Sequence, residues 1–270
     1  MILVNGVATA SLPIPDRGLA YGDGIFRTFA LRDGRVCAWR RQFAKLAADA
    51  RALGIKCPEE ALLRADVGEV THGATDGAVK IVVTRGSGAR GYAYSPGQPA
   101  TRIVSASELP QHPRHWTKQG VAVHLCSLRL ARQPALAGVK HLNRLENVLA
   151  RAEWSDPEIA EGLLQDSAGN VIGGTMTNLF LVTRDGLLTP DLGHSGVAGV
   201  TRERVIESAR RNGIACRVAA ITLSELFAAS EVILVNSLIG AWCIRQLGAA
   251  AWEQGSMTAT VRRWLEEDDD

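Results

Sequence analysis

The sequence lacks an apolar run long enough to cross a bilayer, and Met1 leads into "MILVNG" without the charged region and cleavage site of a secretory signal. It also lacks a charge imbalance, because 30 basic and 28 acidic side chains leave a net charge of +2. No basic block or aromatic-interleaved basic stripe is present. We therefore expect a cytoplasmic protein whose partners include neither membranes nor nucleic acid.

Cysteine is also scarce. The five cysteines are odd in number, widely scattered and without a CxxC pair, so neither a disulfide framework nor a zinc cluster is expected, and no other metal is indicated. At 270 residues the chain is long enough for two modest domains or one large α/β unit, each with a real core.

Residues 1–108 predict a small N-terminal α/β domain. Asn5-Gly6 and Asp33-Gly34 suit the positive φ angles of two-residue hairpin turns. Apolar residues repeat at helical spacing over residues 41–53 and stop before a glycine. The remaining predicted elements are a helix that starts near Pro58 and strands over residues 79–86 and 101–109.

Residues 109–120, "LPQHPRHWTKQG", predict an interdomain linker because they contain two prolines and a glycine. Residues 121–270 predict a larger C-terminal domain of mixed β structure with helices, so the expected fold class is two-domain α/β (α+β). Its predicted elements are strands over 121–130 and 231–237, a hairpin over 178–190, a helix over 201–212 and a solvated tail at "EEDDD".

Lys140 lies in "LAGVKHLNRLENVLARAEW", where a loop gives way to a helical pattern in a chain that uses arginine far more often than lysine. Leu142, Leu145, Leu149 and Ala152 recur at helical spacing and predict a buried helix face. A partly desolvated lysine at a helix N-terminus can lose its proton and act as a nucleophile or a base. A surface lysine before a helix is the alternative for this stretch taken alone.

The loop "SGVAGVTRERV" is the second informative stretch. Gly196 and Gly199 let the backbone approach a ligand, and Thr201 begins a helix whose free N–H groups and dipole favour an anion. A plain loop and helix cap is the alternative. The glycine-rich "RGSGARGY" at residues 85–92 lacks the pattern of a P-loop, so an ordinary nucleotide site is not expected.

An activated lysine, a separate phosphate cradle and two α/β halves together indicate pyridoxal 5′-phosphate. The stretches "DRGLAYGDGIFRT", "TRGSGARGY", "LAGVKHLNRLENVLARAEW", "TNLFLV" and "GVAGVTR" follow one another as in the fold-type IV pyridoxal-phosphate enzymes. That family includes branched-chain and D-amino acid aminotransferases. The chain resembles it over essentially its whole length and is most similar to its aminodeoxychorismate lyases.

The resemblance implies a homodimer in which Lys140 is the Schiff-base lysine and Thr28 lies beside it. It also implies that the phosphate is held by the backbone amides of Val200 and Thr201, the Thr201 hydroxyl and Ser237, with Asn178 near the cofactor ring. The plain alternatives are a strand residue at 28 and a turn residue at 178.

Two positions depart from the family pattern. Lys45, in "QFAKL", stands where the family usually has a phosphate-binding arginine, and a lysine keeps the charge but loses the bidentate fork. Gly173 stands where the family usually has the glutamate that keeps the pyridine nitrogen protonated. Either a water or another side chain substitutes for that glutamate, or the ring works with an unprotonated nitrogen as a weaker electron sink.

The activity implied by the resemblance converts 4-amino-4-deoxychorismate to 4-aminobenzoate and pyruvate, a step of folate biosynthesis. The substrate amine would displace Lys140 from the cofactor, and the freed lysine would take the ring proton at C4. Because formation of an aromatic ring makes the elimination strongly downhill, this reaction tolerates a cofactor ring that withdraws electrons less strongly. Candidate contacts to the two substrate carboxylates are Arg27, Arg90 and Arg102 with Tyr92, although each arginine could instead be a solvated strand or loop residue.

Two other functions stay open at this stage. An aminotransferase of the same fold, acting on D- or branched-chain amino acids, would use Lys140 to move a proton between two carbons. The second is a non-catalytic homologue, which remains an alternative because Gly173 replaces the glutamate that is usual in the family.

Overall fold

The computed structural model describes residues 1–267, which divide into two compact units. Unit 1 contains residues 1–110 and residues 139–143, and unit 2 contains residues 111–138 and 144–267. The chain therefore passes between the units three times, after residues 110, 138 and 143. The sequence predicted a single passage through a linker and did not anticipate the return of 139–143.

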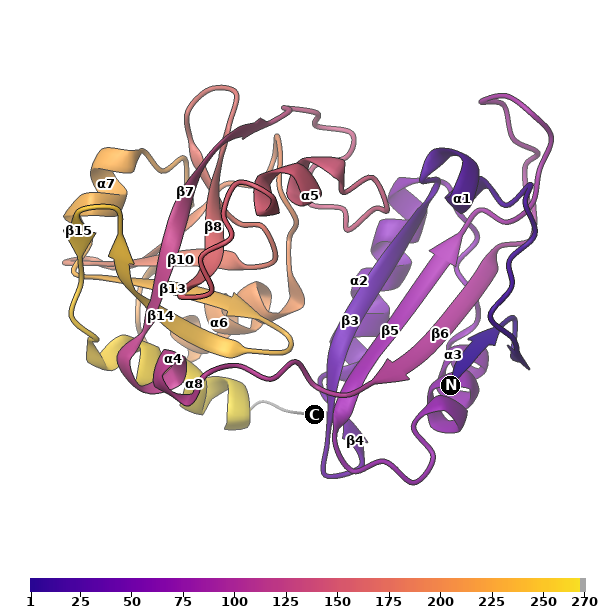
Figure 1. Cartoon of the computed structure of the whole chain (residues 1–270), viewed down its shortest axis with the longest axis horizontal. Helices are drawn as coiled ribbons and strands as arrows, with labels where there is room; N and C mark the ends of the chain where they lie inside the picture. The colour runs from indigo at the N-terminus through magenta and orange to yellow at the C-terminus, as the bar shows by residue number, and fades with distance from the viewer. Residues whose placement is uncertain (268–270) are drawn as a thin grey trace. The chain divides into compact units, whose positions relative to one another are not determined.

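Unit 1 is an antiparallel sheet with two helices on one face. The strand order is β2-β1-β6-β5-β3-β4, and α2 packs on β3 while α3 packs on β6 (Figure 1). Phe29, Leu46 and Leu63 are buried in the core between the helices and the sheet. The elements are β1 (Ile2–Val4), β2 (Val7–Ala8), α1 (Arg17–Tyr21), β3 (Gly24–Arg32), β4 (Arg35–Val36), α2 (Trp39–Ala52), α3 (Glu60–Val70), β5 (Gly77–Thr84) and β6 (Thr101–Ser107).

Both predicted hairpins of unit 1 are confirmed. The φ angles are 51° and 84° at Asn5 and Gly6, and 49° and 71° at Asp33 and Gly34, the left-handed pair that a type I′ turn requires. The helix predicted over residues 41–53 is α2, and the two predicted strands that follow are β5 and β6. The helix predicted near Pro58 begins at Glu60.

Unit 2 is built on one long mixed sheet, with strand order β12-β11-β10-β13-β14-β7-β8-β9 and β15 paired to β14. Strand β9 also contacts β10 and β11, so the sheet curls back on itself. Leu179 and Leu181 belong to one core cluster, whereas Phe180 between them belongs to another, as alternation in a strand requires. The elements are α4 (Arg114–Gln119), β7 (Val121–Leu130), α5 (Leu145–Arg151), β8 (Ile159–Asp166), β9 (Val171–Gly174), β10 (Asn178–Thr183), β11 (Gly186–Pro190), α6 (Val200–Arg211), β12 (Cys216–Ala219), α7 (Leu223–Ala228), β13 (Glu231–Asn236), β14 (Gly240–Leu247), β15 (Ala250–Ala251) and α8 (Ser256–Glu267).

The predicted strand over 121–130, the hairpin over 178–190, the helix over 201–212 and the strand over 231–237 are confirmed as β7, β10 with β11, α6 and β13. The tail was misread in part, because Glu266 and Glu267 end helix α8; residues 268–270 lie outside the described residues. Among the helices of residues 1–267, none combines the length and apolar character needed to cross a membrane.

The segment predicted as a linker contains a helix. Pro113 precedes α4 and Gly120 follows it with a φ of 84°, so the proline and the glycine bound a helix instead of marking an open connection. Trp116 of α4 is buried, and its ring lies 5.3 Å from that of Trp242 in the core of unit 2. Apolar burial therefore assigns this segment to unit 2.

The helix predicted to follow Lys140, from about Leu142, begins instead at Leu145. Residues 140–142 are extended beside β3: the Phe26 N–H donates to the Lys140 carbonyl oxygen (3.0 Å), and the Leu142 N–H donates to that of Gly24 (2.9 Å). The predicted buried face is also wrong, since Leu145 and Leu149 are 75% and 60% exposed and only Ala150 of α5 is buried. The periodic leucines lie on the outer surface of this helix in a single chain.

Candidate functional site

Lys140 is held by backbone contacts within unit 1. Its N–H donates to a carboxylate oxygen of Asp49 (3.2 Å), and its carbonyl accepts from β3. Its ammonium lies 4.7 Å from the centre of the Phe26 ring. Phe26 and Thr28 point to the same side of β3, because side chains two apart in a strand share a face. The Lys140 amine and Thr28 thus lie on the sheet face that α2 and α3 leave uncovered, and a direct contact between them stays a prediction.

Asp49, which sequence reasoning missed, is the centre of a buried cluster on the other face. Its carboxylate accepts from Arg27 and Lys45, and the Arg27 and Asp49 side chains are 3% and 2% exposed. A buried carboxylate between two cations is strongly held, and removing one partner would leave an uncompensated charge. Asp49 therefore fixes the backbone at Lys140 while it binds Lys45, the lysine expected at the phosphate.

Arg27 and Arg102 do not lie where a substrate clamp was expected. Arg27 is one residue from Thr28 and so points to the helix-covered face, where Asp49 binds it. Arg102 of β6 donates to Asp66 of α3 (2.6 Å) on that same face. Both arginines are therefore held in ion pairs on the helix-covered face, the Arg27 pair buried and the Arg102 pair partly buried, and neither lies on the face that carries Lys140.

Arg90 and Tyr92 belong to an exposed loop that follows β5, and Tyr92 is 87% exposed. The buried guanidinium of Arg17 anchors this loop by donating to the carbonyl oxygens of Gly91, Tyr92 and Ala93. Arg17 is in turn paired with Asp23 (2.9 Å), which also binds Arg85 through both carboxylate oxygens. The loop tip is therefore free to contact a ligand while its base is fixed.

Asp23→Asn should lower the free energy of unfolding by about 2 kcal/mol at neutral pH, because it leaves two buried guanidinium groups without their counter-ion. Burial raises the pKa of Asp23, but hydrogen bonds and charge attraction from Arg85 and Arg17 outweigh it and hold this pKa below its usual value. A lowered carboxyl pKa gives stability that is present above the unfolded pKa of about 4 and lost as the pH falls through the folded value.

The check is urea unfolding of the wild type, Asp23→Asn and the exposed control Asp76→Asn over a range of pH. The difference between the wild type and Asp23→Asn should shrink toward low pH, and Asp76→Asn should follow the wild type. A difference that stays constant down to about pH 3 would contradict the role of the charge.

Unit 2 has a candidate anion site of its own at the N-terminus of α6. Gly199 is the N-cap and supplies no side-chain cap, so the first N–H groups of the helix are open to an anion. The hydroxyls of Thr201 and Ser237 lie 3.2 Å apart, which brings together two residues predicted to hold the phosphate. Val200 and Thr201 are buried, so an anion there would be partly shielded from water.

Asn178 braces this cradle. Its amide donates to the Val197 carbonyl oxygen (2.8 Å), and its side-chain oxygen accepts from the Gly199 N–H (3.2 Å). A Cβ at residue 199 would meet that oxygen at 2.3 Å, so only glycine fits. Asn178 was expected near the cofactor ring, and within unit 2 its contacts are those of a residue that shapes the phosphate loop.

Gly173 offers no acid to a pyridine nitrogen. It has a φ of 153°, and a Cβ there would meet the Thr177 carbonyl oxygen at 2.8 Å. Beside the neighbouring Gly174 lies Glu161 of β8, which is fully buried and accepts hydrogen bonds from Thr175 and Thr177. Burial raises the pKa of Glu161 against the opposing effect of those hydrogen bonds. The residues present therefore fit the phosphate of pyridoxal phosphate, but not the usual partner of its ring nitrogen.

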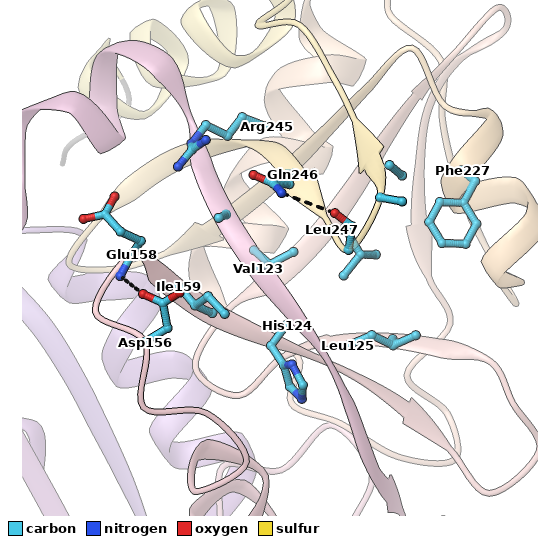
Figure 2. A pocket seen from close by; sticks show the side chains of 14 residues that line it. Val123, His124, Leu125, Asp156, Glu158, Ile159, Phe227, Arg245, Gln246 and Leu247 are labelled. Carbon is cyan, nitrogen blue, oxygen red and sulfur yellow. Dashed lines mark hydrogen bonds between the residues drawn. The ribbon is translucent and has the colours of Figure 1, made fainter.

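A cavity of about 660 Å³ also lies within unit 2, but it holds none of the predicted site residues. Figure 2 shows His124 of β7, Arg245 of β14 and Phe227 of α7 around it. It contains no lysine that could bind a carbonyl group. The thiols of Cys126 and Cys243 are also poor candidates for a nucleophile. Burial raises the pKa of Cys126 to about 12 and that of Cys243 to about 11, which leaves both thiols protonated at neutral pH.

Comparison with known proteins identifies the family of the chain. Residues 24–247 match the family described as amino-transferase class IV. An aminodeoxychorismate lyase of Vibrio harveyi is 37% identical over 89% of both chains, and a putative branched-chain-amino-acid aminotransferase of Methanocaldococcus jannaschii is 30% identical over 84% of this chain and 80% of its own. The crystal structure of a 4-amino-4-deoxychorismate lyase from Pseudomonas aeruginosa superposes with a TM-score of 0.93 at 43% identity and covers 99% of both chains. With a match that spans both Lys140 and the cradle at α6, the chain belongs to the class IV amino-transferase family.

Proposed function

We propose that the protein is a pyridoxal-phosphate-dependent lyase that converts 4-amino-4-deoxychorismate to 4-aminobenzoate and pyruvate. The observation that carries the proposal is Lys140, whose backbone is fixed by Asp49 and β3 while its amine stays on the open sheet face. The relatives from Vibrio harveyi and Pseudomonas aeruginosa, which carry the name of this activity, support it at 37% and 43% identity.

When bound, pyridoxal phosphate supplies an aldehyde that condenses with amines and a ring that draws electrons from the neighbouring carbon. Lys140 would hold the cofactor and then, once displaced, take the proton from the ring carbon that bears the substrate amine. The C–O bond to the enolpyruvyl group breaks with that group taking the bonding electrons, and a proton completes pyruvate. No water and no oxidant is consumed, and aromatisation drives the step.

The other proposed contacts follow from their positions. The Val200 and Thr201 amides and the Thr201 and Ser237 hydroxyls would bind the phosphate, with Asn178 bracing their loop. Arg90 and Tyr92 on the anchored loop would bind substrate carboxylates. Arg27 and Arg102 serve instead through ion pairs that shape unit 1, and Lys45, which is paired with Asp49, stays a candidate contact to the phosphate.

A product assay tests the proposal. The purified protein, supplied with pyridoxal phosphate and aminodeoxychorismate, should release 4-aminobenzoate and pyruvate in equal amounts. Amino-group exchange between an amino acid and a 2-oxo acid, without 4-aminobenzoate, would favour the aminotransferase alternative, which the similarity to the Methanocaldococcus jannaschii protein supports. A protein that binds the cofactor and turns over neither substrate would be a non-catalytic homologue. A cytoplasmic location stays a prediction.

We propose that the protein acts as a homodimer and that α5 contributes to its interface. Leu145, Val148 and Leu149 are 75%, 60% and 60% exposed, and their spacing puts them on one side of the helix. Contiguous apolar side chains of this kind on a single chain mark an interaction surface. A second copy is the partner that the family resemblance implies.

Leu149→Arg should therefore convert the dimer to a monomer at micromolar concentration, because an isologous interface places the new charge twice in an apolar contact. Sedimentation velocity measures the outcome. Leu62→Arg, a matched change at a residue of α3 that is 44% exposed, should leave the dimer intact. A wild type that sediments as a monomer, or a Leu149→Arg dimer, would contradict the assignment of this surface.

A further inference from the structure

Glu161 is a buried acid whose role the proposed reaction does not explain. It is fully buried in β8, and none of its partners among residues 1–267 is a cation. A carboxylate buried without a counter-ion is costly unless hydrogen bonds satisfy it. The structure therefore has to supply hydrogen-bond donors to it, and most of them come from one short segment.

Five groups donate to the Glu161 carboxylate. One oxygen accepts from the N–H of Gly162 (2.9 Å) and from the N–H (3.0 Å) and hydroxyl (2.5 Å) of Thr175. The other accepts from the Met176 N–H (3.1 Å) and the Thr177 hydroxyl (2.9 Å). We call residues 174–177 the clasped turn, since all these donors but one lie in it.

Only a carboxylate fits this set of donors. Backbone N–H groups approach both oxygens, and an amide side chain would present its own N–H to one of them. A Cβ at residue 174 would meet a Glu161 carboxylate oxygen at 2.6 Å, so a glycine at the start of the turn makes room for the acid. Five donors also fill the roughly four acceptor sites of a carboxylate, so Glu161 has no capacity left for the cofactor ring nitrogen.

The clasped turn connects to both halves of the phosphate cradle. On one side the Asn236 side chain donates to the Met176 carbonyl oxygen (3.3 Å). The side-chain oxygen of Asn236 accepts from the N–H groups of Leu238 and Ile239 (both 2.9 Å). These two bonds shape the turn that carries Ser237. On the other side the turn leads directly into Asn178, which holds the loop at Gly199.

We propose that Glu161 is a positioning residue for the phosphate cradle: by fixing the clasped turn it sets the places of Asn178 and Asn236, and through them the Gly199 loop and Ser237. The inference rests on the proposed function in one respect, that the cradle holds the phosphate of pyridoxal phosphate. It adds a residue that touches neither cofactor nor substrate.

The test compares pyridoxal phosphate with pyridoxal, which lacks only the phosphate. Absorbance titrations give a dissociation constant for each, and the ratio of the two constants reports the cradle alone, because a general loss of stability weakens both. In Glu161→Gln the preference for pyridoxal phosphate should fall about tenfold or more, as expected when a supporting residue behind a binding site is changed. Glu158→Gln, an exposed acid 59% accessible near the start of the same strand, is the matched control.

Thr177 keeps the proposal testable if Glu161→Gln does not fold. Thr177→Val removes one donor to Glu161 and should lower the same ratio, whereas Thr177→Ser keeps the hydroxyl and should restore it. If the wild type prefers pyridoxal phosphate and the folded Glu161→Gln and Thr177→Val proteins keep that preference, the positioning role of Glu161 is wrong. The proposal that the cradle binds the phosphate would be unaffected. If the wild type itself shows no preference, the cradle does not bind phosphate, and both proposals fall.

Discussion

Lys140→Ala should give a folded, colourless protein that releases no 4-aminobenzoate. The substitution removes the amine that lies 4.7 Å from the centre of the Phe26 ring, but it leaves the backbone hydrogen bonds of residues 140 and 142 to Asp49, Phe26 and Gly24 in place. Loss of a nucleophile and proton acceptor affects the chemical step, where it costs several orders of magnitude, far more than it affects stability. We therefore expect an unfolding midpoint close to that of the wild type.

The measurements are the visible absorbance of the lysine-bound cofactor, the mass of the protein after borohydride treatment, and the lyase assay. Wild-type protein should gain the mass of one reduced cofactor at Lys140. Lys118→Ala, which changes an exposed lysine of α4, should behave as the wild type. Retention of the lysine-bound absorbance in Lys140→Ala would show that another lysine carries the cofactor.

Gly173→Glu, which restores the residue usual in the family, should destabilise the protein by about 3 kcal/mol or more. The φ of 153° is one that other residues rarely adopt, and the Cβ would meet the Thr177 carbonyl oxygen at 2.8 Å. That carbonyl belongs to the clasped turn and accepts from the Gly174 N–H, so it cannot move freely. The backbone at residue 173 therefore fits glycine and does not fit glutamate without a local shift, which the sequence alone did not indicate.

Urea unfolding measures this cost. Gly169→Ala is the control, because Gly169 has a φ of 86° but no atom within 4 Å of an added Cβ, so it reports backbone strain without the collision. In the fraction that folds and binds cofactor, a carboxylate beside the ring nitrogen should favour its protonated form and raise transamination more than lyase activity. A stable variant with an unchanged spectrum and unchanged rates would mean that residue 173 does not face the ring nitrogen.

Short sequence patterns correctly predicted the turns and helices that depend only on neighbouring residues. The two hairpin turns follow from Asn-Gly and Asp-Gly pairs, and α2 and α6 follow from apolar periodicity that ends at glycines. The error at Lys140 has a different origin. Helical periodicity continued through residues that pair with β3, and that pairing depends on a strand more than 100 positions earlier in the chain, which no local pattern reports.

The site residues show the same division. Lys140, Thr201 and Ser237 could be selected because motifs mark them, but the partners that position them could not. Strand alternation from Thr28 was enough to place Arg27 on the opposite face, yet nothing in the sequence identified Asp49 as its counter-ion. Glu161 is recognisable in the sequence as an acid within the mostly apolar strand "IAEGLLQD", although its donors lie up to 16 residues away.

The extended segment at residues 139–143 also limits how the chain can be divided. Strand β4 pairs with β3 only at Leu31 and Arg32, and residues 140–142 cover the start of the same edge. A fragment that ends at residue 110 would expose the backbone groups of Gly24 and Phe26 on an open sheet edge, which invites pairing with another chain. Residues 1–110 are thus not an autonomous module that could be excised or exchanged between proteins. The residue proposed to carry the cofactor belongs to the stretch that completes their sheet.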